Sequence, residues 1–255
     1  MKFLSELRKR NKLLYTFGWI CWIGVFATMI ASTRDERQIM NINAWIKPFK
    51  FFLSVAIFSW TMAWYMFYLE ARNKVKIYSG VVVIVMSVEL FIISLQAIRG
   101  KTSHFNTSTF FDQTLFNIMG IAIVVLTFWT LYIAMLFFRQ KKFSISQSYL
   151  WGIRLGLLFF VIFSFEGGYM AAKLAHSVGG PDGSPGLPIL NWSRAYGDLR
   201  VAHFFGIHSL QVLPLIGYYI ATKKAQVFVF AGLYFLMVAS LLVLALYKHP
   251  LIQAY

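Results

Sequence analysis

The chain has 255 residues, of which 59% are hydrophobic and only 13% are charged, and its formal net charge is +15. A soluble domain of this size usually has about 25% charged residues, so the composition excludes an ordinary soluble domain and indicates a membrane protein. The single cysteine, Cys21, excludes an internal disulfide and leaves histidines and carboxylates as the side chains that could hold a metal ion.

Seven uninterrupted apolar runs of about 20 residues follow one another along the chain. Because they cover most of the sequence, we expect one all-α polytopic domain over residues 1–255, with seven transmembrane helices and no separate soluble domain. The first run is long for the apolar core of a cleavable signal peptide, which favours a retained first helix. The expected spans are 13–32, 49–69, 77–98, 114–138, 150–172, 202–221 and 226–247.

The basic residues indicate the orientation of these spans. If the N-terminus lies in the cytoplasm, the N-terminal segment and the short loops on the same side hold thirteen lysines and arginines, whereas the opposite segments hold ten in longer loops. Each short loop assigned to the inside is basic, so the positive-inside rule predicts a cytoplasmic N-terminus and an outer C-terminus. The net charge then serves orientation and attraction to anionic headgroups of the lipid bilayer, and nothing in it indicates nucleic acid.

The connection between the fifth and sixth expected helices, residues 173–200, is long and unusual in composition. Its sequence, KLAHSVGGPDGSPGLPILNWSRAYGDLR, combines glycines and prolines with several large apolar side chains. A disordered linker would lack such side chains, and loops of this length in a compact protein are usually lids or binding loops. We therefore expect a structured loop that caps the outer side.

Three charged residues fall inside the expected helices, where a charge normally has a partner or a function. Arg154 lies near the inner end of its helix and can reach the headgroups. Glu89 and Glu166 lie deeper, in the outer half of the membrane, and their side chains are too short to reach water. Either each is a neutral carboxyl that is hydrogen-bonded to a neighbouring helix, or the two belong to a functional site.

The sixth expected helix opens with the segment GDLRVAHFFGIHSLQVLPL, which brings polar side chains to the head of an apolar helix. At 100° per residue, Arg200 and Gln211 share one stripe of this helix, and His203 and His208 flank the stripe about 140° apart. Two imidazoles so arranged on an ideal helix cannot easily share one small metal ion. The segment therefore predicts one wall of a polar pocket.

Ionisable side chains gather on the predicted outer side. All five histidines and both deep glutamates fall there, whereas the inner halves of the helices contain almost nothing ionisable. We therefore expect an outward-facing pocket for a small-molecule or lipid ligand. Its candidate residues are Glu89, Glu166 and Asp198 as catalytic groups, Gln96, Arg99, Arg200 and Gln211 as substrate-binding groups, and His104, His203 and His208 as ligands of a divalent metal such as zinc.

Several other cofactors are disfavoured by the same sequence. The inner side has no histidine, which argues against a transmembrane pair of haem ligands. The last expected helix has no lysine that could form a Schiff base with retinal. A Walker loop, a dinucleotide fingerprint and a nucleophile elbow are also missing from the sequence, so NAD- or ATP-dependent chemistry and a familiar serine hydrolase are not expected.

Three functions from different classes fit this pattern. The favoured one is a membrane-embedded hydrolase, with or without a bound metal, that acts on a lipid or another amphipathic substrate. The second is a proton- or cation-coupled transporter or channel, which needs a polar path to the inner face, and the sequence shows little of one. The third is a sensor or assembly factor that binds a ligand or partner from the outside, with histidines as a pH-sensitive element. The sequence does not decide between an enzyme and the other two classes.

Three stretches carry a resemblance to known sequences: WIKPFKFFLS at 45–54, ELFIISLQAIRGKTSHFN at 89–106, and the segment at 197–215. Together they resemble an uncharacterised family of bacterial multi-pass inner-membrane proteins. The resemblance covers most of the chain and implies a bacterial inner membrane with the pocket facing the periplasm. It implies no activity and no cofactor.

The chain is also similar to seven-helix membrane metallohydrolases of the ceramidase and progestin-receptor-like superfamily, in which several histidines and an aspartate bind zinc. Here the last expected helix lacks a histidine pair and the spacing of the histidines differs. This similarity is therefore an analogy of architecture and carries no site residues over.

Overall fold

The structure is a computed structural model that describes residues 2–253, and apart from four strands of two residues each its regular elements are helices. Seven of these helices are long and apolar enough to cross a membrane. The predicted all-α fold with seven spans is confirmed, and the seven helices indicate a multi-pass membrane protein. The predicted orientation, with the N-terminus inside and the C-terminus outside, stays a prediction.

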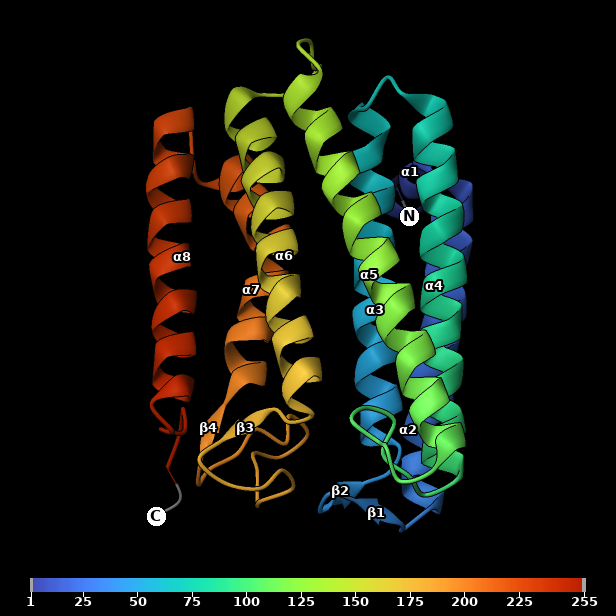
Figure 1. Cartoon of the computed structure of the whole chain (residues 1–255). Helices are drawn as coiled ribbons and strands as arrows, with labels where there is room; N and C mark the ends of the chain where they lie inside the picture. The colour runs from blue at the N-terminus through green and yellow to red at the C-terminus, as the bar shows by residue number, and fades with distance from the viewer. Residues whose placement is uncertain (1, 254–255) are drawn as a thin grey trace. The chain divides into compact units, whose positions relative to one another are not determined.

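The helices follow the chain in the order shown in Figure 1. They are α1 (Lys2–Arg10), α2 (Lys12–Arg34), α3 (Ile46–Tyr65), α4 (Arg72–Ile98), α5 (Phe110–Arg139), α6 (Gln147–Lys173), α7 (Leu199–Tyr219) and α8 (Lys224–Leu246), with a single 3-10 turn, η1 (Met66–Tyr68), after α3.

Several helices extend beyond the apolar runs that predict them. α4 begins at Arg72 and not at residue 77, and α5 begins at Phe110 and not at residue 114. An apolar window detects only the stretch suited to hydrocarbon, whereas the helix continues through polar turns on either side. For the same reason the short basic helix α1 was not predicted at all.

The contacts between residues divide the chain into two compact units, Met1–Trp129 and Thr130–Tyr255, so that α5 contributes its first part to one unit and its last part to the other. In the first unit, α2 packs against α3, and α4 packs against both. A core cluster joins the three helices and consists of Phe17, Cys21, Val55, Ala56 and Leu90.

A small hairpin connects α2 to α3 in the first unit. Strands β1 (Gln38–Ile39) and β2 (Ile42–Asn43) are antiparallel, with Ile39 opposite Ile42. The two residues between them, Met40 and Asn41, both have positive φ angles, of 55° and 60°, as a tight two-residue hairpin turn requires.

In the second unit the most extensive packing is between α6 and α7. Gly152 and Gly156 allow it, because a Cβ at Gly152 would lie 2.6 Å from the carbonyl oxygen of Leu213, and one at Gly156 would lie 2.8 Å from that of Ser209. The Ser209 hydroxyl also donates a hydrogen bond to the Gly156 carbonyl, at 3.2 Å. Small residues four apart bring helix backbones together in this way in membrane proteins.

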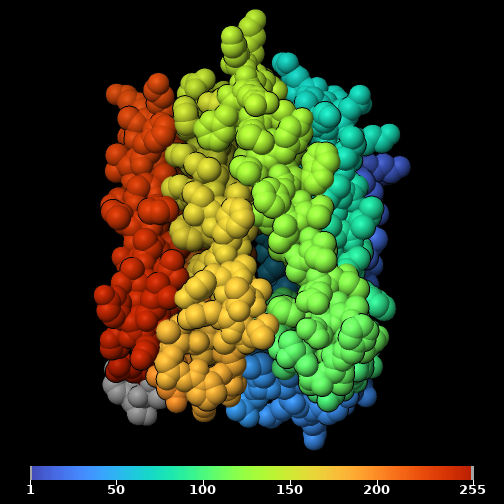
Figure 2. Space-filling view, in the orientation of Figure 1, coloured from blue at the N-terminus to red at the C-terminus, as the bar shows by residue number. Residues whose placement is uncertain are grey.

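The last helix, α8, packs on α6 and α7 along one narrow stripe. The surface of α8 that faces away from these two helices carries many exposed apolar side chains and forms the red edge of the view in Figure 2. Since most of this helix is apolar, its uncovered side suits contact with lipid. Its buried residues are Val227, Ala231, Val238 and Ala245.

Replacing Gly152 by alanine is expected to destabilise the second unit by about 1–3 kcal/mol, because the added methyl group meets the backbone of α7 and no flexible side chain can move aside. Gly232→Ala on α8 is the matched control, since no described atom lies within 4 Å of its added Cβ; it should be neutral or slightly stabilising. Thermal unfolding of the purified protein in detergent measures both. Equal stability of the two variants would contradict the close packing of α6 on α7.

Candidate functional site

The candidate residues divide between the two units. Each unit contains one deep glutamate, one buried aspartate paired with an arginine, and at least one histidine. The first unit holds Glu89, Gln96, Arg99 and His104, and the second holds Glu166, Asp198, Arg200, His203, His208 and Gln211.

In the first unit, Gln96 and Arg99 both engage Asp112. The Nη1 atom of Arg99 lies 2.5 Å from Oδ1 of Asp112 and 2.6 Å from Oε1 of Gln96. The Gln96 amide donates to the same carboxylate oxygen at 2.9 Å, and the Thr109 hydroxyl donates to Oδ2 at 2.8 Å. The Asp112 side chain has no exposed surface. The two side chains predicted to bind substrate therefore hold a buried carboxylate that joins α4 to α5.

Asp112 was not among the predicted site residues, although the sequence contains a signal for it. Thr109 and Asp112 have the spacing of a capping box at a helix start. In the structure the backbone N–H of Asp112 donates to the Thr109 hydroxyl oxygen at 3.1 Å. The prediction that the helix begins at residue 114 placed Asp112 in a loop and hid this pattern.

Glu89 lies on α4 and is only 2% exposed. Its Oε1 atom has no hydrogen-bond partner among residues 2–253, and the same holds for the buried Trp22 Nε1 on α2 and Ser59 Oγ on α3. The positive charge that acts on Glu89 comes from Lys47, in the first turn of α3. Each of the three packed helices of this unit thus contributes an unsatisfied buried polar atom.

His104 lies in the loop between α4 and α5. Its Nδ1 atom is 3.1 Å from the Ser103 hydroxyl, and its ring packs against Phe51, Phe105 and Phe116. The imidazole is therefore surrounded mainly by aromatic rings.

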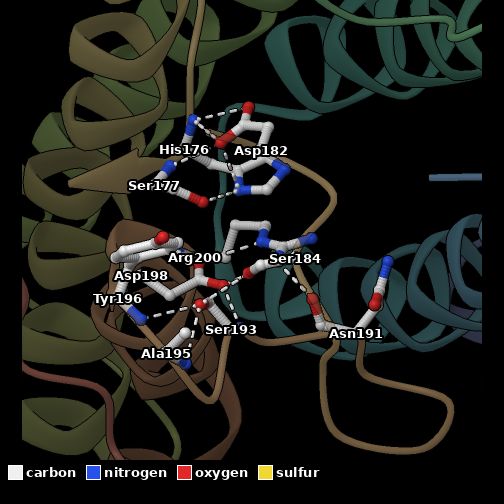
Figure 3. Close-up of polar contacts among 10 residues, drawn as sticks. All are labelled: His176, Ser177, Asp182, Ser184, Asn191, Ser193, Ala195, Tyr196, Asp198 and Arg200. Atoms are coloured by element: carbon white, nitrogen blue, oxygen red, sulfur yellow. Dashed lines mark hydrogen bonds and ion pairs between the residues drawn. The ribbon is translucent and has the colours of Figure 1, made fainter. Parts of the chain in front are cut away.

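In the second unit, Asp198 caps α7 and organises the loop of residues 174–198, hereafter the α6–α7 loop (Figure 3). Its carboxylate accepts from the Arg200 N–H at 3.0 Å, from Arg200 Nε at 2.9 Å and Nη2 at 2.6 Å, and from the Ser193 N–H at 2.8 Å. Arg200 also donates to the Asn191 carbonyl. Burial opposes ionisation, but the hydrogen bonds and charge of Arg200 outweigh it and lower the pKa of Asp198. Asp198 is therefore a structural carboxylate.

A second aspartate fixes the start of the α6–α7 loop (Figure 3). Asp182 accepts from the backbone N–H groups of His176 and Ser177, at 3.1 Å and 2.7 Å, and lies 3.2 Å from Nδ1 of His176. Strands β3 (Ser177–Val178) and β4 (Gly197–Asp198) then pair the two ends of the loop. The loop is thus ordered by its own hydrogen bonds, while its place on the outer side stays a prediction.

Glu166 lies on α6 and is 8% exposed, and neither of its carboxyl oxygens has a hydrogen-bond partner in the described part of the chain. The next residue, Gly167, lies beneath the ring of His203 from α7, because a Cβ there would lie 3.1 Å from its Cε1 atom. A Cβ added at Gly168 would have no described atom within 4 Å, apart from its chain neighbours and the backbone of its own helix. The first of the two glycines after Glu166 is therefore explained by the close approach of His203, and nothing in the structure explains the second.

The contacts of His203 fix its tautomer. Its Nδ1 atom is 2.8 Å from the carbonyl oxygen of Phe163. A carbonyl oxygen can only accept a hydrogen bond, so Nδ1 carries the proton, and in the neutral imidazole Nε2 is the acceptor. His208 has a different partner, since its Nδ1 atom lies 3.2 Å from Oε1 of Gln211 and its ring meets Phe204 edge-on.

The assignment of His104, His203 and His208 as metal ligands stays a prediction. Among residues 2–253, no group of three or more histidine, cysteine, aspartate or glutamate side chains is close enough together to hold a metal ion. His203 and His208 instead engage Phe163 and Gln211. Comparison with protein-family models, with curated proteins and with solved structures finds no match, so a function for this chain rests on its residues alone.

Proposed function

We propose that the protein takes up and releases protons at Glu89 and Glu166, as the coupling step of a membrane transporter or channel. One observation carries this proposal: both carboxyls are buried in spanning helices, and three of their four oxygens lack a hydrogen-bond partner in the described chain. Buried polar groups are normally hydrogen-bonded, and ionisable groups at membrane depth mark ion and proton pathways.

The other candidate groups support this function better than hydrolysis. Asp112 and Asp198 are held by arginines and by hydrogen-bond donors of their own unit. Arg99 and Arg200, which a hydrolase would use to bind an anionic substrate, are engaged in these same pairs. A group of metal ligands is missing from the described residues. The hydrolase that the sequence favoured would therefore have few side chains free to bind substrate or catalyse, whereas neither deep glutamate is held in an ion pair among the described residues.

The chemistry follows from the surroundings of the two carboxyls. A charged side chain near the bilayer centre costs at least about 2.5 kcal/mol, so each site is stable when a proton or cation neutralises it. If the site opened to water on one side of the membrane, the carboxylate could lose that ion to the water. When the site closed again, the buried carboxylate would have to be neutralised by another ion. The positive charge of Lys47 acts on Glu89, whereas no cation among the described residues acts on Glu166 in the same way. The two sites are therefore expected to release their ions unequally.

Proton exchange can be measured with the purified full chain in liposomes that enclose a pH-sensitive dye, under an imposed pH difference and membrane potential. The wild type is expected to exchange protons, and Glu89→Gln and Glu166→Gln should each reduce the exchange towards that of empty liposomes. Glu36→Gln is the matched control, because this glutamate is exposed in the loop after α2.

Infrared spectroscopy supplies a second readout that needs no transport. The wild type should show the carbonyl band of a protonated carboxylic acid, and this band should decrease in both glutamine variants but not in Glu36→Gln. Proton exchange in the double variant Glu89→Gln/Glu166→Gln at the wild-type rate, or a wild type indistinguishable from empty liposomes, would overturn the proposal.

A further inference from the structure

A basic groove lies where α1 meets α2, away from the residues discussed so far. It has a cavity volume of about 540 Å³ and is lined by Ser5, Arg8, Lys9, Lys12 and Tyr15. The first four are spaced three, one and three residues apart, so they follow one side of the helical path through the junction.

The junction that shapes the groove is anchored from within the first unit. Asn11 interrupts the helix with an extended φ of −155°, and its side-chain oxygen accepts from the Leu14 N–H at 3.1 Å as the N-cap of α2. Its amide nitrogen donates to the Ser79 hydroxyl on α4 at 2.8 Å. The side chain of Asn11 therefore fixes where α1 ends and α2 begins, and with it the position of the groove.

The three cations of the groove lack an acidic partner. Arg8, Lys9 and Lys12 are exposed, and none forms an ion pair with a described residue. The acidic residue nearest in sequence, Glu6, pairs with Arg10 at 2.9 Å. Like charges at this spacing repel one another, so an anion bound in the groove would remove an unfavourable interaction as well as add favourable ones.

The aromatic side chains around this groove are typical of the level of lipid headgroups. The Arg10 guanidinium lies 3.8 Å from the ring centre of Trp64, and the exposed ring of Phe3 stacks on the same indole. Tyr15, which lines the groove, stacks on Trp60. Tyrosine and tryptophan concentrate at membrane interfaces, and a short helix with basic and apolar sides lies in the interface plane.

We propose that this groove binds the phosphate of an anionic phospholipid. The three cations neutralise the phosphate, and the hydroxyl of Tyr15, which lines the groove, can donate a hydrogen bond to it, whereas the Ser5 hydroxyl donates to the Lys2 carbonyl at 2.9 Å. A lipid fits better than free phosphate, because the surface of α2 next to the groove exposes apolar side chains, with Leu13 46% and Ile20 54% exposed. The acyl chains would lie along this surface. The proposal does not depend on the function assigned to the deep glutamates.

Binding of phosphatidylglycerol to the full chain in detergent tests the proposal, by native mass spectrometry and by thermal unfolding, with phosphatidylcholine and inorganic phosphate as comparisons. In the variant Arg8→Gln/Lys9→Gln/Lys12→Gln, affinity for phosphatidylglycerol should fall about 100-fold, because the loss of each positive charge should weaken binding about fivefold. Its matched control, Arg139→Gln/Lys141→Gln/Lys142→Gln, removes the same charge from exposed positions around the α5–α6 loop and should bind like the wild type.

The outcomes separate the sources of the phosphate. Loss of binding in the groove variant alone, with phosphatidylcholine bound weakly by every form, would support a phospholipid site. Equal losses in both triple variants would show general charge attraction and overturn the site. If inorganic phosphate stabilises the protein against thermal unfolding as much as phosphatidylglycerol does, the proposal that a lipid occupies the groove is overturned. If the triple variant fails to fold, Lys12→Gln should still lower the affinity about fivefold.

Discussion

Replacing Glu166 by methionine is expected to raise the free energy of unfolding by about 1–3 kcal/mol, the usual cost of a buried polar group that has no hydrogen bond. Both carboxyl oxygens of Glu166 are buried and lack a partner among the described residues. Methionine has a similar length, favours helices and adapts to irregular spaces. The substitution therefore removes the unsatisfied group while keeping the contacts of α6.

Chemical unfolding of the purified protein in detergent measures this gain, and Glu89→Met is the comparison within the same chain. Glu89 has one unsatisfied oxygen and the charge of Lys47 acting on it, so its replacement should gain less. A more stable Glu166→Met variant that no longer exchanges protons would be a trade of stability for activity, as expected at a functional site. A clear loss of stability would mean that the carboxyl is bonded and structural, and it would remove the main support for the proposed function.

The seven spans could be predicted from the sequence because each is an apolar run that has the length of a bilayer crossing. The hairpin β1–β2 could not, since its two-residue turn contains Met40 and Asn41 and lacks the glycine that usually marks such turns. The helix α1 was missed because a nine-residue basic segment gives no apolar run. These elements depend on contacts with the rest of the first unit, such as those of Arg10 with Trp64.

The deep glutamates could be recognised from the sequence because a single carboxyl stands out in an apolar run. The side chains that surround them in the structure could not be predicted. The partners of the two arginines show that the sequence indicates contacts between near neighbours better than contacts across a loop. Arg200 binds an aspartate two residues away, but Arg99 binds Asp112 across the α4–α5 loop. Helical angles place His203 and His208 on different sides of α7, yet only the packed structure gives their partners, Phe163 and Gln211.

Replacing Asp198 by asparagine is expected to lower the free energy of unfolding by about 3 kcal/mol, because removal of one partner leaves the charge of Arg200 uncompensated. The carboxylate is 2% exposed and joins Ser193 in the α6–α7 loop to the first turn of α7. Asparagine keeps the shape and one acceptor oxygen but loses the charge. The α6–α7 loop should consequently open, and trypsin should cleave after Arg194, the one lysine or arginine within it.

The first unit offers a matched control for this substitution. Asp35 and Arg37 form a pair with the same spacing and the same contact to the terminal nitrogen, at 2.6 Å, but the Arg37 side chain is 51% exposed, compared with 26% for Arg200. Exposed ion pairs contribute little to stability, so Asp35→Asn should cost clearly less and should leave the α6–α7 loop resistant to trypsin. Equal losses for the two variants would contradict the structural role of Asp198.

The pH dependence gives an independent test of the same carboxylate. The pKa of Asp198 is lower in the folded protein than in the unfolded chain, where an aspartate has a pKa of about 3.9. Its pair therefore stabilises the fold fully above that value, and the stabilisation is lost as the pH falls through the folded pKa. The melting temperature of the wild type should decrease in this acidic range, and that of Asp198→Asn should decrease less steeply. Since the neutral asparagine resembles the protonated aspartate, the two curves should approach each other at the acidic end, and parallel curves would show that Asp198 gains nothing from its charge.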